Sequence, residues 1–118
     1  MKENPKYERS KLFALEIIKL YKYLVDEKNE YVLSKQVLRS GTSIGANIAE
    51  SQGAQSPADF VSKLSIALKE ADETIYWLEL LRMSDAIDDP HFQPLYTECI
   101  SLAKILTTII NKVKAEKK

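Results

Sequence analysis

Apolar residues recur every three or four positions along almost the whole chain, and strand-like alternation is absent. At about 100° per residue, this spacing places them on one side of a helix. Polar clusters and prolines interrupt the pattern and predict four helices, at about residues 8–27, 32–53, 57–84 and 90–114. Helices of this length with short connections indicate one all-α domain over residues 1–118. We expect an antiparallel up-down-up-down four-helix bundle.

The predicted boundaries depend on capping residues. Ser56 followed by Pro57 is the clearest start signal, because a serine N-cap and a first-turn proline both favour a helix. The second helix could begin at Tyr31 or at Ser34, whose hydroxyl suits an N-cap. It ends near Gly53, a residue suited to a left-handed conformation after a helix.

The second predicted helix has a polar side and a side with small residues. Gly41, Gly45 and Ala49 recur at a spacing of four, and two glycines inside a helix cost about 1 kcal/mol each relative to alanine. Close approach of a neighbouring helix would explain them. The polar side, with two glutamates of the third helix, forms what we call the polar stripe: Arg39, Ser40, Ser43, Asn47, Glu50, Glu70 and Glu73.

The polar stripe has two interpretations. It could fix the register of helices through hydrogen bonds, inside the bundle or between subunits. Alternatively, the Arg39 guanidinium and the hydroxyls could bind phosphate or another anion.

The third predicted helix has a second apolar face beyond the one that a bundle buries. A helix of a monomer needs one buried face, so a second suggests a partner chain. We therefore expect a homo-oligomer whose interface includes Ile66, Tyr76, Trp77 and Leu80.

Composition and charge restrict the function. Hydrophobic residues make up 45% and charged residues 29%, as in ordinary soluble domains. No apolar run approaches the roughly 20 residues of a membrane span, and the polar start MKENPKYERSK does not resemble a secretory signal, so we expect a cytoplasmic protein. The formal net charge of zero argues against a generic nucleic-acid binder. Lysines of the first and last helices could still form a local patch for nucleic acid, comprising Lys11, Lys19, Lys22, Lys104 and Lys112.

Residue combinations typical of enzymes and metal sites are missing. His91 is the only histidine, and Cys99 is the only cysteine, without a nucleophile motif around it. The Gly41–Gly45 segment lacks the lysine of a phosphate-binding loop. We therefore expect no enzyme activity, no metal and no cofactor.

The segment Leu38–Glu50, LRSGTSIGANIAE, together with Asp59-Phe60, Leu64–Ala71 and Glu73–Leu78, resembles the 23S rRNA intervening-sequence protein family, also called the four-helix bundle protein family. The resemblance implies an up-down bundle that assembles into a ring-like homopentamer, and the family has no established enzymatic activity. Its relatives include the accessory variability protein of diversity-generating retroelements, a basic pentamer that binds reverse transcriptase and nucleic acid. This chain differs from those relatives because it is neutral.

Together these observations favour a non-enzymatic, homo-oligomeric scaffold that presents a surface to another macromolecule, RNA or protein. The alternative is a nucleic-acid-binding accessory protein associated with RNA, the ribosome or a retroelement. A bundle that binds an anion or small molecule around Arg39 is a third, weaker hypothesis.

Overall fold

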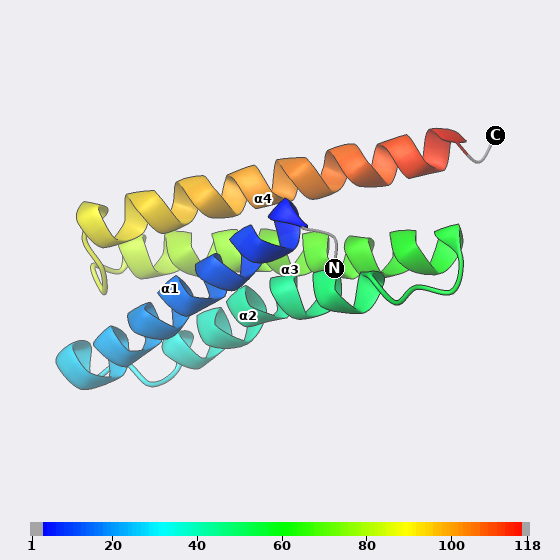
Figure 1. Ribbon diagram of the computed structural model, residues 1–118. Coiled ribbons are helices and arrows are strands. Elements are labelled where there is room, and N and C mark those ends of the chain that lie inside the picture. Colours follow the sequence, from blue (N-terminus) through cyan, green and yellow to red (C-terminus); the bar gives the residue numbers. More distant parts are fainter. Residues whose placement is uncertain (1–3, 117–118) are drawn as a thin grey trace.

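The chain forms four helices and, within residues 4–116, which a computed structural model describes, no strand. The helices are α1 (Pro5–Lys28), α2 (Leu33–Ser51), α3 (Pro57–Met83) and α4 (Asp89–Glu116). Each packs on the next along the chain, α1 also packs on α4, and the backbones of the diagonal pairs do not approach each other closely. The result is an elongated bundle of 49 × 26 × 21 Å, which confirms the all-α, four-helix prediction (Figure 1).

Side-chain caps explain where α1 and α3 begin. The Ser56 hydroxyl accepts a hydrogen bond from the Asp59 N–H at 3.0 Å, which confirms the predicted start of α3. The same combination of cap and proline starts α1 three residues before the expected position, because the Asn4 side chain accepts from the Tyr7 N–H at 3.3 Å.

The residues predicted to cap α2 at its two ends are not the ones that do so in the structure. The Glu30 carboxylate caps this helix by accepting N–H groups of residues 32–34, whereas the Ser34 side chain is buried and its hydroxyl has no partner. Gly53 does not have a positive φ, because α2 ends at Ser51 in a tight turn. Left-handed backbone occurs instead at Asn29, with φ of 54°, at the end of α1, and at Asp85, with φ of 64°, after α3.

The glycines of α2 let α1 lie close against it. Gly41 faces the buried side chain of Ile17, and Gly45 faces the buried Ser10. A Cβ atom at Gly41 would lie 2.9 Å from Cγ1 and from Cγ2 of Ile17, too close for a normal contact. The close approach expected for these glycines is therefore confirmed.

The core consists of the apolar stripes of all four helices. It includes Phe13 and Ile17 of α1, Ile44 of α2, Leu78 of α3 and Leu102 of α4. None of the helices, as far as residues 4–116 are concerned, combines the length and the apolar character that crossing a membrane requires.

Candidate interaction surface on helices α2 and α3

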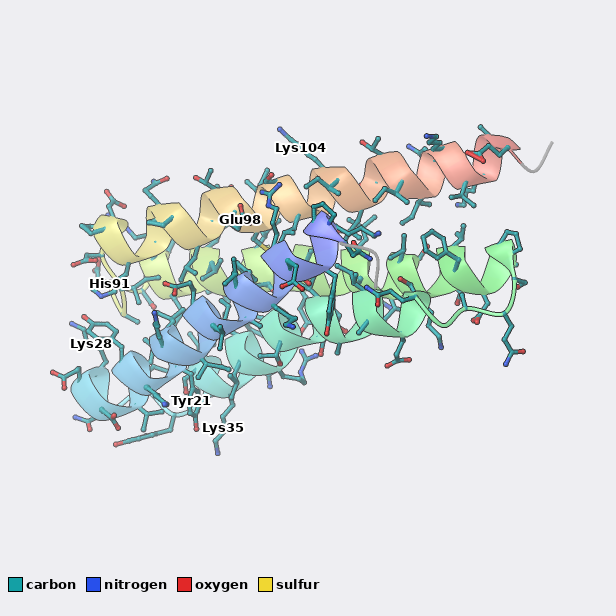
Figure 2. The ribbon with its side chains drawn as sticks, viewed as in Figure 1. Tyr21, Lys28, Lys35, His91, Glu98 and Lys104 are labelled. Atoms are coloured by element: carbon teal, nitrogen blue, oxygen red, sulfur yellow. The ribbon has the colours of Figure 1, made fainter. Side chains whose placement is uncertain are left out.

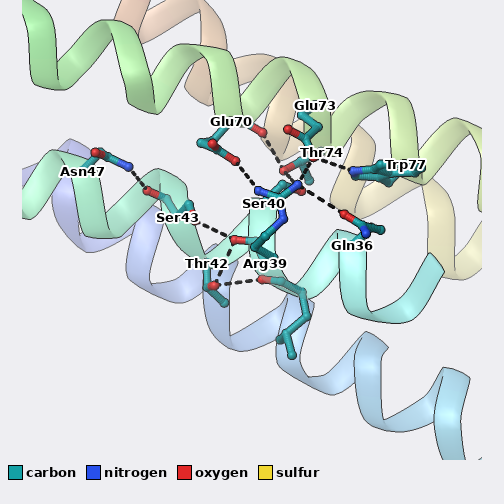
Figure 3. A network of polar contacts seen from close by, with 11 residues as sticks. Gln36, Arg39, Ser40, Thr42, Ser43, Asn47, Glu70, Glu73, Thr74 and Trp77 are labelled. Atoms are coloured by element: carbon teal, nitrogen blue, oxygen red, sulfur yellow. Dashed lines mark hydrogen bonds and ion pairs between the residues drawn. The ribbon is translucent and has the colours of Figure 1, made fainter. Parts of the chain in front are cut away.

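Arg39 joins α2 to α3 at the centre of the polar stripe (Figure 3). Its Nη1 donates to Glu70 Oε1 at 3.1 Å, and its Nη2 contacts both the Glu73 carboxylate and, at 3.4 Å, Gln36 Oε1. Glu73 also accepts a hydrogen bond from the Trp77 indole N–H at 2.9 Å. One half-exposed guanidinium thus holds two carboxylates, and one of these fixes the orientation of Trp77.

Ser40 contacts α3 beneath Arg39. Its hydroxyl accepts a hydrogen bond from the Thr74 hydroxyl at 2.8 Å, and both side chains are fully buried. Thr74 belongs to the network but was absent from the sequence-based set, although it lies three residues after Ala71 and four before Leu78, at the spacing of the inward stripe.

The remaining members of the polar stripe do not reach the Arg39 network directly. Ser43 donates to the Arg39 carbonyl at 2.7 Å, and Asn47 donates to the Ser43 carbonyl at 2.9 Å, so both bind the backbone of their own helix. Glu50 is exposed and lies 3.6 Å from the ammonium of Lys63. Of the two hydroxyls that an anion site would need, the Ser43 hydroxyl is therefore engaged with a backbone carbonyl and the Ser40 hydroxyl with Thr74.

The electrostatics of the network favour a register-fixing role over an anion site. The guanidinium already has two carboxylate partners, and these would repel a phosphate that approached Arg39. Because the carboxylates come from α3 and the guanidinium from α2, the contacts fix the position of one helix along the other.

Large apolar side chains remain exposed on α3 beside this network. Ile66 is 40% exposed, Tyr76 53% and Met83 77%. Trp77 and Leu80 are half-buried, and the rings of Tyr76 and Trp77 meet edge to face at 5.1 Å. Met83 was missing from the predicted interface, although it continues the same helical spacing three residues after Leu80.

The five lysines of the predicted nucleic-acid patch are all exposed but do not gather in one place. Lys11 and Lys22 are exposed on α1, and Lys19 lines the groove between α1 and α4, where it pairs with Glu16 at 3.0 Å. Figure 2 shows Lys104 on α4, away from the lysines of α1. Lys104 lines a different groove, between α3 and α4, together with Asp72. Lys112 lies two turns further along α4.

A groove of about 480 Å³ lies between α1 and α4 and was not anticipated from the sequence. Its apolar lining includes Leu12, Phe13, Leu20, Tyr23, Pro94 and Leu95. Near one end, Arg9 donates to Glu98 at 2.7 Å and to Ser101 at 2.9 Å. Near the other end, the rings of Tyr23 and His91 stack at 4.4 Å. Only the packing of α1 on α4 creates this groove, so a reading of single helices could not find it.

Cys99 and His91 are the two side chains that could be chemically reactive, and the surroundings of both indicate a structural role. Burial raises the pKa of the Cys99 thiol to about 12, so the sulfur is not a nucleophile at neutral pH. His91 Nδ1 lies 2.6 Å from Asp88 Oδ1, and the hydrogen bond to His91 lowers the pKa of the Asp88 carboxyl. In the portion from Asn4 to Glu116, no three metal-ligating side chains converge in a group that could hold an ion.

Comparison with known proteins places the chain in a family. The model of the 23S rRNA-intervening sequence protein family matches residues 2–108. A crystal structure from Bacteroides thetaiotaomicron, of a protein with unknown function from the S23 ribosomal protein family, is 51% identical, with a TM-score of 0.88. The similarity covers 89% of this chain and 97% of that one. No curated protein matches the sequence. The family match extends over most of the chain, and the chain therefore belongs to the 23S rRNA-intervening sequence protein family.

Proposed function

We propose that this chain is a non-enzymatic scaffold in which antiparallel up-down-up-down bundles assemble into a ring-like homopentamer. The ring acts by presenting a surface to another macromolecule in the cytoplasm. The observation that carries the proposal is the row of exposed apolar side chains on α3 beside the Arg39 network.

The row has the spacing of a helix–helix interface. Ile66, Glu73, Tyr76, Leu80 and Met83 follow one another at intervals of seven, three, four and three residues, which keeps them along one side of α3. Exposed aromatic and aliphatic side chains in such a row gain stability when a second subunit covers them. The polar side chain in the row, Glu73, is already neutralised by Arg39, so covering it is less costly than burying a free carboxylate.

The network gives this interface a rigid base. Arg39 holds Glu73, Glu73 holds the indole of Trp77, and Trp77 contacts the ring of Tyr76. Aromatic side chains fixed before association lose less conformational entropy when they bind. Arg39 therefore supports assembly indirectly, by fixing the residues that contact the neighbouring subunit.

The mass of the protein in solution tests the proposal. Light scattering on a size-exclusion column should give a mass of about five times the 13.4 kDa chain. Ile66→Glu should lower that mass, because it places a charge in the apolar row. Val32→Lys is the control, since Val32 is also a branched apolar residue and is 71% exposed but lies between α1 and α2. A wild-type mass of 13.4 kDa, or an Ile66→Glu variant with unchanged mass, would refute the scaffold.

Trp77→Ala tests the aromatic part of the interface. The half-buried ring contacts Tyr76, so its removal should weaken assembly while circular dichroism confirms that the helices remain. If the variant has the same oligomer mass as wild type at every concentration over a hundredfold dilution, Trp77 does not have this role.

The second candidate function is binding of RNA, which the three exposed lysines on α1 favour. Binding driven by phosphates weakens steeply with salt. Fluorescence anisotropy with bulk RNA at low and high salt measures this directly. Loss of binding in Lys11→Glu and Lys22→Glu would support the accessory role, and no binding at the lowest salt would eliminate it.

A further inference from the structure

Helix α1 carries two leucines that the bundle does not bury. Leu12 is 63% exposed and Leu15 is 54% exposed. At about 100° per residue, Leu15 lies roughly opposite the buried Phe13 and Ile17, whereas Leu12 lies about 100° from Phe13, at the edge of the groove between α1 and α4. Packing on α2 and α4 leaves both leucines in contact with water.

The leucines belong to a row that we call the α1 seam, made of Glu8, Leu12, Leu15 and Lys19. The intervals of four, three and four residues are those of the contact positions in paired helices. All four residues are exposed. Along the helix, the seam is acidic, apolar, apolar and basic.

This order makes the seam complementary to a second copy of itself in one orientation. If two α1 helices run in opposite directions about the midpoint of Leu12 and Leu15, each Leu12 faces a Leu15 and each Glu8 faces a Lys19. A parallel pair would place Glu8 against Glu8 and Lys19 against Lys19, and like charges repel. The charge order thus favours an antiparallel partner over a parallel one.

The charges beside the seam already have partners within the chain. The Lys11 ammonium lies 4.9 Å from the centre of the Tyr7 ring, toward the start of α1. Glu16 binds Lys19 at 3.0 Å and keeps its ammonium on this face of the helix. Neither side chain covers Leu12 or Leu15, since both leucines remain more than half exposed.

We propose that the α1 seam is a second self-association surface, which pairs two copies of this chain antiparallel about a two-fold axis. The contact involves one helix face with two leucines per copy, so it is smaller than the interface of a stable complex and gives weak, reversible pairing. The seam lies on α1, and the row of exposed side chains lies on α3, the diagonal helix of the same bundle, so the two surfaces are separate within one chain. If the neighbouring subunit of the proposed ring leaves α1 uncovered, pairing through α1 links assemblies that are built through α3.

A double-mutant cycle on the two charges tests the pairing and its orientation. Sedimentation velocity over a wide concentration range measures the dissociation constant of the pairing. Glu8→Lys and Lys19→Glu should each weaken it by about tenfold, because each change creates two like-charge contacts per pair. The combined variant exchanges the two charges and should return to within about threefold of wild type.

Matched controls reverse exposed charges away from the seam. Glu27→Lys, near the end of α1, and Lys104→Glu, on α4, should leave the dissociation constant unchanged. Circular dichroism checks that every variant keeps its helices. The proposal is wrong if the combined variant is no better than the single ones, if the controls weaken pairing equally, or if wild type shows no pairing at the highest concentration.

The same double-mutant cycle in the Ile66→Glu background distinguishes pairing through α1 from assembly of the ring through α3. There, pairing through α1 should persist between single chains and give a mass of twice 13.4 kDa at high concentration. Leu12→Glu should abolish that species. If Leu12→Glu instead dissolves the ring in the wild-type background, α1 belongs to the ring interface and the two-fold pairing is refuted.

Discussion

Replacing Gly41 with alanine tests whether the small residues of α2 exist to let α1 approach. In an unobstructed helix this substitution stabilises the protein by about 1 kcal/mol, because alanine is the better helix former. Here the new methyl group would lie 2.9 Å from two carbon atoms of Ile17 and 3.3 Å from a third. The usual contact distance between such atoms is about 3.5–4.0 Å.

The net effect of Gly41→Ala follows from two opposing terms. Extra bulk in a well-packed site costs about 1–3 kcal/mol, because Ile17 is fully buried and cannot move aside freely. Subtracting the gain in helix propensity leaves a loss of stability of about 1 kcal/mol. For a domain of this size, that loss corresponds to a decrease of about 4 °C in Tm.

Urea unfolding followed by circular dichroism measures this loss. All variants are compared at one protein concentration, because association would add to the measured stability. Gly53→Ala is the matched control, since its new Cβ would meet only the Glu50 carbonyl at 3.8 Å and its φ is not positive. We expect the control to differ from wild type by less than about 0.5 kcal/mol.

A second substitution identifies the clash as the cause. Ile17→Ala removes the two carbon atoms nearest to the new methyl group, so Gly41→Ala in that background should be neutral or stabilising. If Gly41→Ala stabilises the otherwise unchanged protein by about 1 kcal/mol, close packing is not the reason for the glycine.

Three further predictions concern single side chains. Asn4→Ala should lower the free energy of unfolding by about 1 kcal/mol in urea titrations, because the Tyr7 N–H loses its cap, and Asn4→Asp should largely retain it. Cys99 should not react with a thiol reagent at pH 8 in the native protein but should react fully in urea, and fast native labelling would contradict its burial. The hydrogen bond from Arg82 lowers the pKa of the Asp89 carboxyl below 3.8. Its stabilising effect should therefore be complete above that value and be lost as the pH falls through the lowered pKa, so Asp89→Asn should destabilise the protein at pH 6 and have a progressively smaller effect as the pH falls below 3.8, as measured by urea midpoints.

The sequence predicted the positions of the helices better than it predicted which side chains of different segments contact each other. The repeat of apolar residues and the Ser56-Pro57 signal identify α3 almost to the residue, since both depend on local geometry. The start of α1 was missed although Asn4 and Pro5 form the same kind of signal. Ser34 was one of two candidate starts for α2 and its hydroxyl a candidate cap, but Glu30 lies outside the helix and reaches its N–H groups through a longer side chain.

The candidate site depends on how the helices are rotated against each other, which a single helix pattern does not contain. The helical period places Arg39 on the polar side of α2, but the packing of α2 on α3 decides that it meets Glu70 and Glu73. The same limitation affected the lysines. Lys19 and Lys104 were expected to lie in one patch, whereas the arrangement of α1 and α4 assigns them to different surfaces.

The groove between α1 and α4 has a consequence for local opening of the bundle. Alongside this groove, α1 is joined to α4 by the ion pair of Arg9 near its start and the ring stack of Tyr23 near its end. Few side chains must separate for α1 to move away from α4, whereas α3 packs extensively on both of its neighbours, α2 and α4. Amide hydrogens of α1 should therefore exchange with solvent before those of α3, and α1 should be the first helix accessible to a protease.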